Sequence, residues 1–222
     1  MVGICRTGAL LLLIAGSALL QPLPALSAQT WGKLMSRAEA LGSIAASRVE
    51  QRRAGYLRLA EIGTMEDTPV LLSALQDDEE LIRGVAEQAL WGLWMRANDS
   101  TADPMFQLAL ELVNTNQLDE AKAKLTEVIA IKPDFAEAWH RRGEVMVMLE
   151  AWDAAFHDFE HALELNPYHF GALEGMGHCS LHSGDAQAAV DYFRRAIELN
   201  PNLWDLYETL ERARKAAERN RT

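Results

Sequence analysis

The chain has 222 residues, of which 49% are apolar, and this is enough material for one sizeable or two small packed domains. Its 32 Asp and Glu residues outnumber its 21 Lys and Arg residues, which gives a formal charge of -11. A negative net charge removes the long-range attraction that nucleic acid or an anionic membrane surface requires. We therefore expect neither as a partner.

Residues 1–28 have the features of a cleavable secretory signal peptide. Arg6 is their only charged residue, residues 9–20 are apolar, and small residues follow at Ala25, Ser27 and Ala28. Cleavage is expected after Ser27 or after Ala28, and either cut leaves 20 basic and 32 acidic residues, a charge of -12. The alternative is a retained membrane anchor, but twelve apolar residues form only about 18 Å of helix, against a hydrocarbon core of about 30 Å.

Cleavage of the leader also determines whether the mature chain can form a disulfide. Cys5 lies in the leader, so the mature chain keeps Cys179 alone and can form no internal disulfide. We expect Cys179 to be a small buried apolar residue.

Residues 29–101 are predicted to be helical. Apolar spacing indicates one long amphipathic helix over 31–62, a break at 63–67, a short helix over 68–75 and another helix over 79–96. The stretch DTPVLLSALQDDEELIRGVAEQALWGL (67–93) resembles a single HEAT-type repeat, and Trp91 and Trp94 lie on its apolar stripe. We expect this unit to pack between the first helix and the repeats that begin near residue 102.

The rest of the chain repeats itself every 34 residues, with prolines at Pro133, Pro167 and Pro201. Proline ends a helix because its ring excludes the preceding turn and it lacks an N–H donor. Small residues recur in the same frame, and they allow two antiparallel helices to cross closely. These small residues are Ala109, Gly143 and Gly177 in the first half of each unit, and Ala121, Ala155 and Ala189 in the second half.

These positions, with the stretches AWHRRGEVMVMLEAWDAAFHDFEHALELNP (138–167) and GALEGMGHCSLHSGDAQAAVDYFRRAIELNP (171–201), resemble tandem tetratricopeptide repeats. The resemblance implies an all-α fold, a right-handed α-α superhelix with units at 102–135, 136–169 and 170–203. The first unit departs from the pattern, with Ala109 in place of glycine and Met105 in place of tryptophan. Residues 204–222 should form a capping helix with Trp204, Leu206, Tyr207 and Leu210 on one side.

One sequence pattern suggests an enzyme. HDFEH, residues 157–161, fits the H-x-x-E-H pattern of inverted zinc peptidases, with His157, Glu160 and His161 as the functional residues. The repeat frame instead makes Phe159 and Ala162 the buried positions and turns these three side chains outward. A second pair, His178 and His182 near Glu174, could hold a transition metal, but a polar surface lining is the simpler interpretation.

If the units stack as in the family, the first helix of each unit lines a concave surface. Its exposed positions form an apolar end and an acidic, histidine-bearing end, and it lacks the Lys and Asn residues with which some relatives hold a peptide carboxylate. The repeat region carries 7 basic and 17 acidic residues, which favours a partner with basic and apolar character, unless the acidic residues serve only solvation. The predicted partner-binding residues are Asp103, Phe106, Leu110, Val113, Glu137, His140, Glu144, Val147, Glu174, His178 and Leu181.

The sequence thus predicts an exported protein-interaction adaptor that is not an enzyme and needs no cofactor or metal. Two alternatives stay open: a metal-dependent hydrolase built on residues 157–161, and a structural subunit whose groove is filled by its own copies or by its own amino-terminal helix. The chain also resembles the small, signal-bearing tetratricopeptide proteins of bacteria, and this resemblance implies the periplasm.

Overall fold

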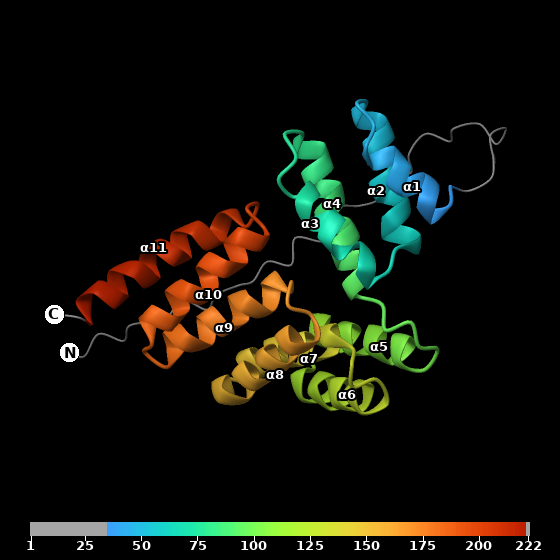
Figure 1. Cartoon of the computed structure of the whole chain (residues 1–222). Coiled ribbons are helices and arrows are strands. Elements are labelled where there is room, and N and C mark those ends of the chain that lie inside the picture. The colour runs from blue at the N-terminus through green and yellow to red at the C-terminus, as the bar shows by residue number, and fades with distance from the viewer. Residues whose placement is uncertain (1–34, 221–222) are drawn as a thin grey trace, which may run out of the picture. The chain divides into compact units, whose positions relative to one another are not determined.

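A computed structural model describes residues 35–220, so the predictions for the leader lie outside the described part of the chain. Over this range the chain forms eleven α-helices and one short 3-10 turn, without a strand (Figure 1). The all-α prediction is confirmed. Within the same range no helix combines the length and the apolar character that a membrane crossing demands.

The amino-terminal segment contains α1 (Arg37–Ile44), α2 (Val49–Ile62), the 3-10 turn Met65–Asp67, α3 (Thr68–Ala74) and α4 (Glu80–Trp94). The prediction of one continuous helix over 31–62 is wrong, because the chain leaves the helix after Ile44 and folds α1 back onto α2. Gly55 makes this close packing possible: a Cβ atom there would lie 2.7 Å from the Ala40 carbonyl oxygen.

Arginine side chains hold this segment together. Arg37 donates two hydrogen bonds, of 3.0 and 2.7 Å, to the buried carboxylate of Asp67 in the 3-10 turn. Arg96, just after α4, donates to the carbonyl oxygens of Ala60 (2.8 Å) and Gly63 (3.1 Å) at the end of α2. Two-pronged contacts of this kind fix the direction of an element as well as its distance.

The remaining helices form antiparallel pairs. These are α5 (Ala102–Asn114) with α6 (Leu118–Ile131), α7 (Ala136–Met148) with α8 (Trp152–Leu165), and α9 (Phe170–His182) with α10 (Ala186–Leu199). A single helix, α11 (Trp204–Arg219), follows and packs on α10.

An aromatic ring packed against glycine sets the distance between the paired helices. The buried ring of Phe159 on α8 lies against Gly143 on α7, where an added Cβ would be 2.7 Å from the ring. The first unit has Ala109 and Leu125 at these two positions, both fully buried in one core. The extra methyl group of alanine is thus matched by a smaller partner, which explains why this unit departs from the glycine pattern.

The expected packing of the HEAT-like unit, α3 and α4, is found on one side only. Helix α4 packs on α2, but its other side shares a core with the third unit and α11 instead of the first unit, and one of its tryptophans also contacts α7. Asn202, in the turn before α11, donates to the Leu75 carbonyl (2.9 Å) and accepts from Arg83 (3.1 Å). Asn200 of the same turn donates to Glu87 on α4 (3.1 Å). These polar contacts border a core that combines side chains of α2, α3 and α4 with those of α9, α10 and α11.

Helix α11 buries Leu206, Leu210, Ala213 and Ala217, one stripe of an amphipathic helix. The prediction that Trp204 and Tyr207 join this side is wrong, since these residues are 70% and 40% exposed. Glu211 stands where the other units have alanine or glycine, so a second helix could not approach α11 as α8 approaches α7. Helix α11 therefore lacks the small residue at which the helices of a pair cross.

We predict that Gly143→Ala destabilises the protein by about 1 to 3 kcal/mol, because the new methyl group overlaps the Phe159 ring, which is buried and has no room to move. Gly84→Ala is the matched control, since a Cβ there meets nothing within 4 Å in α4. It should stabilise by about 0.5 to 1 kcal/mol, because alanine favours the helix over glycine. Urea denaturation of the two variants measures both effects, and equal stabilities would contradict the close packing of Phe159 on Gly143.

Candidate protein-binding surface

The structure places the eleven predicted partner-binding residues in three different environments. Phe106, Glu137 and His140 are buried, so the prediction that their side chains are exposed is wrong. Asp103 is partly exposed, but its two carboxylate oxygens accept hydrogen bonds from the backbone N–H groups of Ala97 (2.8 Å) and residue 99 (3.1 Å). It therefore holds the linker between α4 and α5 in place and is not available to a partner.

The carboxyl-terminal end of α4 covers the buried positions on α7. The Trp91 ring lies 6.2 Å from the His140 ring, and the Arg141 guanidinium lies over the Trp91 ring, 5.6 Å from its centroid. Trp94 stacks on His169, just before α9, with ring centroids 4.9 Å apart. The two tryptophans of α4 thus contact both α7 and the start of α9.

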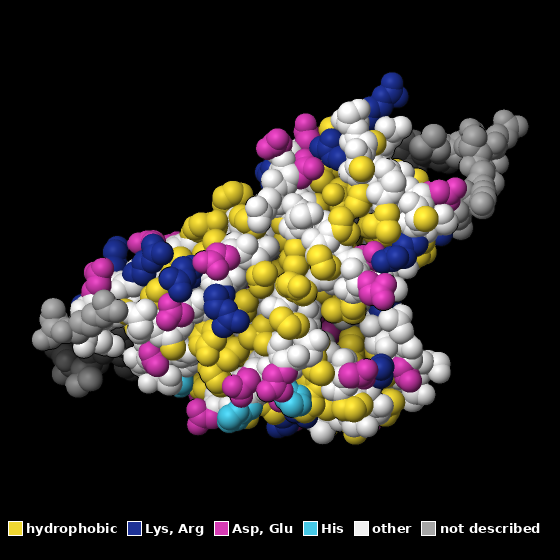
Figure 2. Space-filling model, in the orientation of Figure 1, with side chains coloured by type: hydrophobic (Ala, Val, Ile, Leu, Met, Phe, Trp, Pro, Cys, Tyr) yellow, Lys and Arg dark blue, Asp and Glu magenta, His cyan; other side chains and the backbone are white. Residues whose placement is uncertain are grey.

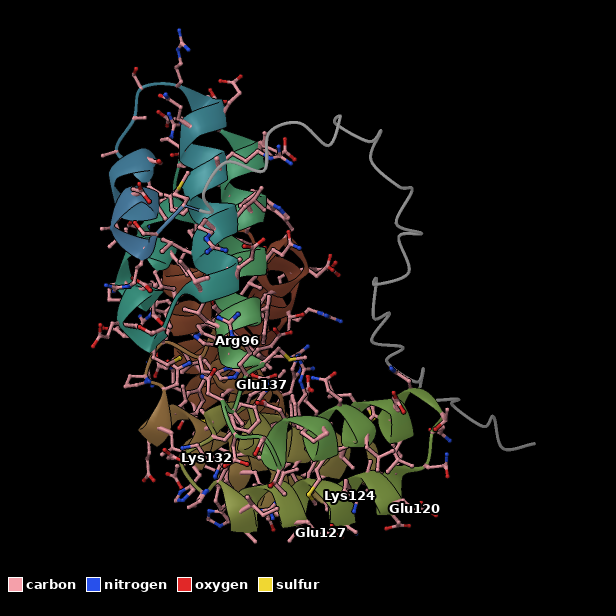
Figure 3. The ribbon with its side chains drawn as sticks, turned by 90° about the vertical axis from the view of Figure 1, so that its right-hand side faces the viewer. Arg96, Glu120, Lys124, Glu127, Lys132 and Glu137 are labelled. Carbon is pink, nitrogen blue, oxygen red and sulfur yellow. The ribbon has the colours of Figure 1, made fainter. Side chains whose placement is uncertain are left out.

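A buried ion-pair network lies beneath the tryptophans, at the place that the Glu137 label marks in Figure 3. The Glu137 carboxylate accepts from Arg141 Nε at 2.6 Å and pairs with His169 Nε2 at 2.9 Å. Burial alone would raise the pKa of Glu137, but the neighbouring Arg141, His140 and His169 outweigh it and hold that pKa well below its usual range. Glu137 is therefore ionised and serves to join α7 to the start of α9.

Glu137, His140 and His169 also form a group of potential metal ligands, with one donor atom of each within 4.8 Å of the others. His169 fits a metal poorly. Its Nδ1 accepts the backbone N–H of Ala172 at 3.2 Å, so its Nε2 carries the proton and donates to Glu137. A metal on Nε2 would move that proton to Nδ1, against the Ala172 donor, and would also lie close to the positive charge of Arg141.

Seven of the predicted residues keep part of their side chains exposed. Glu144 pairs with Arg141 at 2.9 Å, and Glu174 lies 3.7 Å from His178, while the apolar members pack their inner parts against the cores. We call this set the open first-helix surface. It consists of Leu110, Val113, Glu144, Val147, Glu174, His178 and Leu181.

The HDFEH pattern on α8 faces solvent, as the repeat frame predicts. The side chains of His157, Glu160 and His161 are 77%, 53% and 48% exposed, and Figure 2 shows histidines among acidic side chains over this helix. Two members of the pattern are buried: Phe159, and Asp158, which accepts two hydrogen bonds from Arg142 on α7 at 2.7 and 2.8 Å. This part of the pattern is structural.

The two histidines of the second pair contact different aromatic rings. The His178 ring lies 5.2 Å from that of Phe193, whereas the His182 ring stacks on Trp152 at 4.2 Å. Between them Cys179 is buried, and burial raises the pKa of its thiol to about 11. The thiol is therefore protonated at neutral pH and unreactive, in agreement with the expected apolar role.

Reasoning from the sequence missed three residues that shape the surface: Arg141, Asp158 and His169. The repeat frame could have indicated Asp158, because it lies directly beside the buried position of Phe159. No local signal marks Arg141 and His169, since their roles depend on the approach of α4.

Known proteins resemble this chain in its repeat region. The tetratricopeptide repeat family model matches residues 106–169 and 149–203 in two overlapping matches. A TPR repeat-containing protein of Rhizobium etli is 32% identical over 108 residues, which cover 49% of this chain and 53% of that protein. The chain spans about half of the length of that relative.

Two solved structures share the fold. The first TPR of Spaghetti (RPAP3), bound to the HSP90 peptide SRMEEVD, aligns with a TM-score of 0.53 and 21% identity, over 54% of this chain and 96% of that one. The MamA protein aligns with a TM-score of 0.51 and 18% identity, over 69% and 84%. Residues 106–203 therefore match the tetratricopeptide repeat model in sequence and share the fold of such repeats, in agreement with the predicted resemblance.

We predict that the Glu137 network weakens in acid. Burial, followed by the neighbouring His140, lowers the pKa of His169 below 6.5. The unfolded chain therefore binds a proton at this residue at a higher pH than the native state does. The stabilisation is complete above pH 6.5 and is lost as the pH falls below it; the Glu137 contribution follows below pH 4.5.

His169→Asn keeps an acceptor for the Ala172 N–H and removes the titrating ring. The difference in free energy of unfolding between the wild type and this variant should shrink from pH 7.5 to pH 5, as measured by urea denaturation. A difference independent of pH would contradict the assignment of His169.

Proposed function

We propose that the protein is an exported, non-catalytic adaptor that binds a partner protein or peptide on the open first-helix surface. The observation that supports this proposal is the composition of that surface. Leu110 and Val113 are apolar residues of α5. Helix α7 adds apolar Val147 and the partly exposed carboxylate of Glu144, and α9 adds that of Glu174. Such a mixture suits an extended or helical segment with apolar and basic residues.

The negative net charge of the repeats indicates the charge expected of the partner. Residues 102–203 carry 17 acidic and 7 basic residues, so their field attracts cationic segments and repels anionic ones. The HSP90 peptide bound by the similar repeats of Spaghetti, SRMEEVD, contains three acidic residues. A peptide of that charge does not suit this surface, and we propose a net basic ligand instead.

The proposal also assigns roles to the first 28 residues and to the α3 and α4 pair. Residues 1–28 act as the secretory leader, cleaved after Ser27 or Ala28, and the mature protein works in the periplasm. The α3 and α4 pair, within residues 67–93, is a HEAT-like unit. It supports the adaptor by covering the first-helix positions around His140, which leaves the open first-helix surface as the place for a partner.

One observation supports the alternative in which the chain fills its own groove. Helix α4 covers part of α7 and the start of α9. The occupant is α4 and not the first helix. The covering is also partial, since the seven residues of the open first-helix surface stay accessible. We therefore favour the adaptor.

We predict that a photo-crosslinking residue at Val113 or Val147 captures a discrete partner in the cell envelope, whereas the same residue at Glu120, on α6, does not. Glu120 is exposed on the second helix of its unit and is labelled in Figure 3. Glu144→Lys with Glu174→Lys should lower the yield of the captured species roughly fivefold or more, because both changes turn an attraction into a repulsion.

The matched control, Glu120→Lys with Glu160→Lys, changes the net charge equally on the second helices and should leave the yield unchanged. Equal losses in the two double variants, or the same species captured from Glu120, would contradict binding on the open first-helix surface.

A further inference from the structure

Helix α11 has one face that no other helix of the described structure covers. Its buried stripe consists of Leu206, Leu210, Ala213 and Ala217. At 100° per residue, the opposite face carries a tryptophan and two oppositely charged groups of side chains. In chain order these residues are Trp204, Glu208, Glu211, Arg212, Lys215 and Arg219, and all are exposed.

The tryptophan is the most exposed large apolar side chain that the structure describes. Trp204 is 70% exposed and lies beside Tyr207, which is 40% exposed, with ring centroids 6.1 Å apart. Tyr207 corresponds to Trp139 of the second unit, and both donate to the carbonyl oxygen of a proline six residues earlier. Trp139 is covered by the His161 ring of α8, at 4.2 Å. Among residues 35–220 no second helix supplies such a cover to α11.

The charges on α11 are separated along its length. The first half carries Asp205, Glu208 and Glu211, and the second half is mainly basic, with Arg212, Arg214, Lys215 and Arg219 beside Glu218. This order complements itself when two copies of the helix run in opposite directions, because each acidic half then faces a basic half. A parallel pair would place like charges opposite one another.

We propose that two copies of this protein associate through an antiparallel pair of α11 helices. In the register whose two-fold axis passes between positions 211 and 212, the residues at the centre of the uncovered face are complementary. Glu208 lies opposite Lys215 of the second copy, and Lys215 lies opposite its Glu208. The open first-helix surface lies on other helices, so self-association does not depend on the proposed function and does not interfere with it.

The interface is small. One helix against one helix buries less than about 1,200 Å² in total, which is typical of weak, reversible contacts. The proposal therefore requires a monomer–dimer equilibrium that sedimentation equilibrium of the purified protein can follow between about 1 and 500 μM.

Charge reversal and its compensation give the test. Glu208→Lys turns two symmetric attractions into repulsions and should raise the dimer dissociation constant roughly tenfold or more. Adding Lys215→Glu restores both pairs with opposite polarity and should bring the constant back to within about threefold of the wild type. Glu120→Lys, on α6, makes the same change in net charge and should have little effect.

A protein that stays monomeric throughout this range, a Glu120→Lys variant as weak as Glu208→Lys, or a double variant without recovery would overturn the proposal. Circular dichroism and thermal unfolding of each variant establish that it is folded. These exposed positions should tolerate the changes.

A disulfide measures the register independently of affinity. In a Cys5→Ser background, Arg212→Cys places the thiols of the two copies beside the two-fold axis and should give a covalent dimer under mild oxidation. Asp205→Cys places them about 20 Å apart along the helix and should not. Cys179 is buried and does not compete. Equal yields from the two positions would exclude the antiparallel register.

Discussion

The stacking of Trp94 on His169, with Trp91 over His140, is the contact on which the arrangement of this protein depends. It joins the amino-terminal helices to the repeats beside the buried carboxylate of Glu137. Aromatic pairs of this kind contribute about 0.5 to 1.5 kcal/mol each beyond the area they bury. The contact also decides which first-helix positions a partner can reach.

The junction is more polar than a typical core. Trp94 Nε1 and His140 Nδ1 are buried without a hydrogen-bond partner, and so is Asn166 Nδ2, three residues before His169. A buried polar group without a partner lowers the stability of the folded state by roughly 1 to 3 kcal/mol. A bound water that supplies a hydrogen bond removes this penalty. The apolar core that α4 shares with α9 and α11 offsets this cost. The segment is thus held by burial, while its polar groups set its orientation.

Much of the repeat region could be predicted from the sequence, because its determinants are local and periodic. Proline at 34-residue intervals marks the ends of α6, α8 and α10, and Gly143 with Phe159 marks the crossing of α7 and α8. The free face of Trp204 was not predicted, since amphipathic spacing shows that one side of a helix is apolar but not which apolar residue at its end remains uncovered.

The candidate site was predicted only in part, for a physical reason. Family position alone made Glu137 and His140 exposed, and it could not show that a helix far earlier in the chain, α4, would cover them. Glu144 remains accessible one turn beyond His140 on α7, and Glu174, which occupies the position of His140 in the next unit, keeps a 35% exposed side chain. Local sequence thus determines the helices, whereas the contact of α4 with the repeats determines which of their residues form a surface.

The nuclear Overhauser effect between aromatic rings tests this contact most directly. We expect cross-peaks from the Trp94 indole protons to the rings of His169 and Phe170, whose centroids lie 4.9 and 5.1 Å away. Trp139 and His161, at 4.2 Å within the second unit, provide the internal reference. The reference cross-peak without those of Trp94 would show that α4 does not cover the repeats, and would contradict the limits of the open first-helix surface.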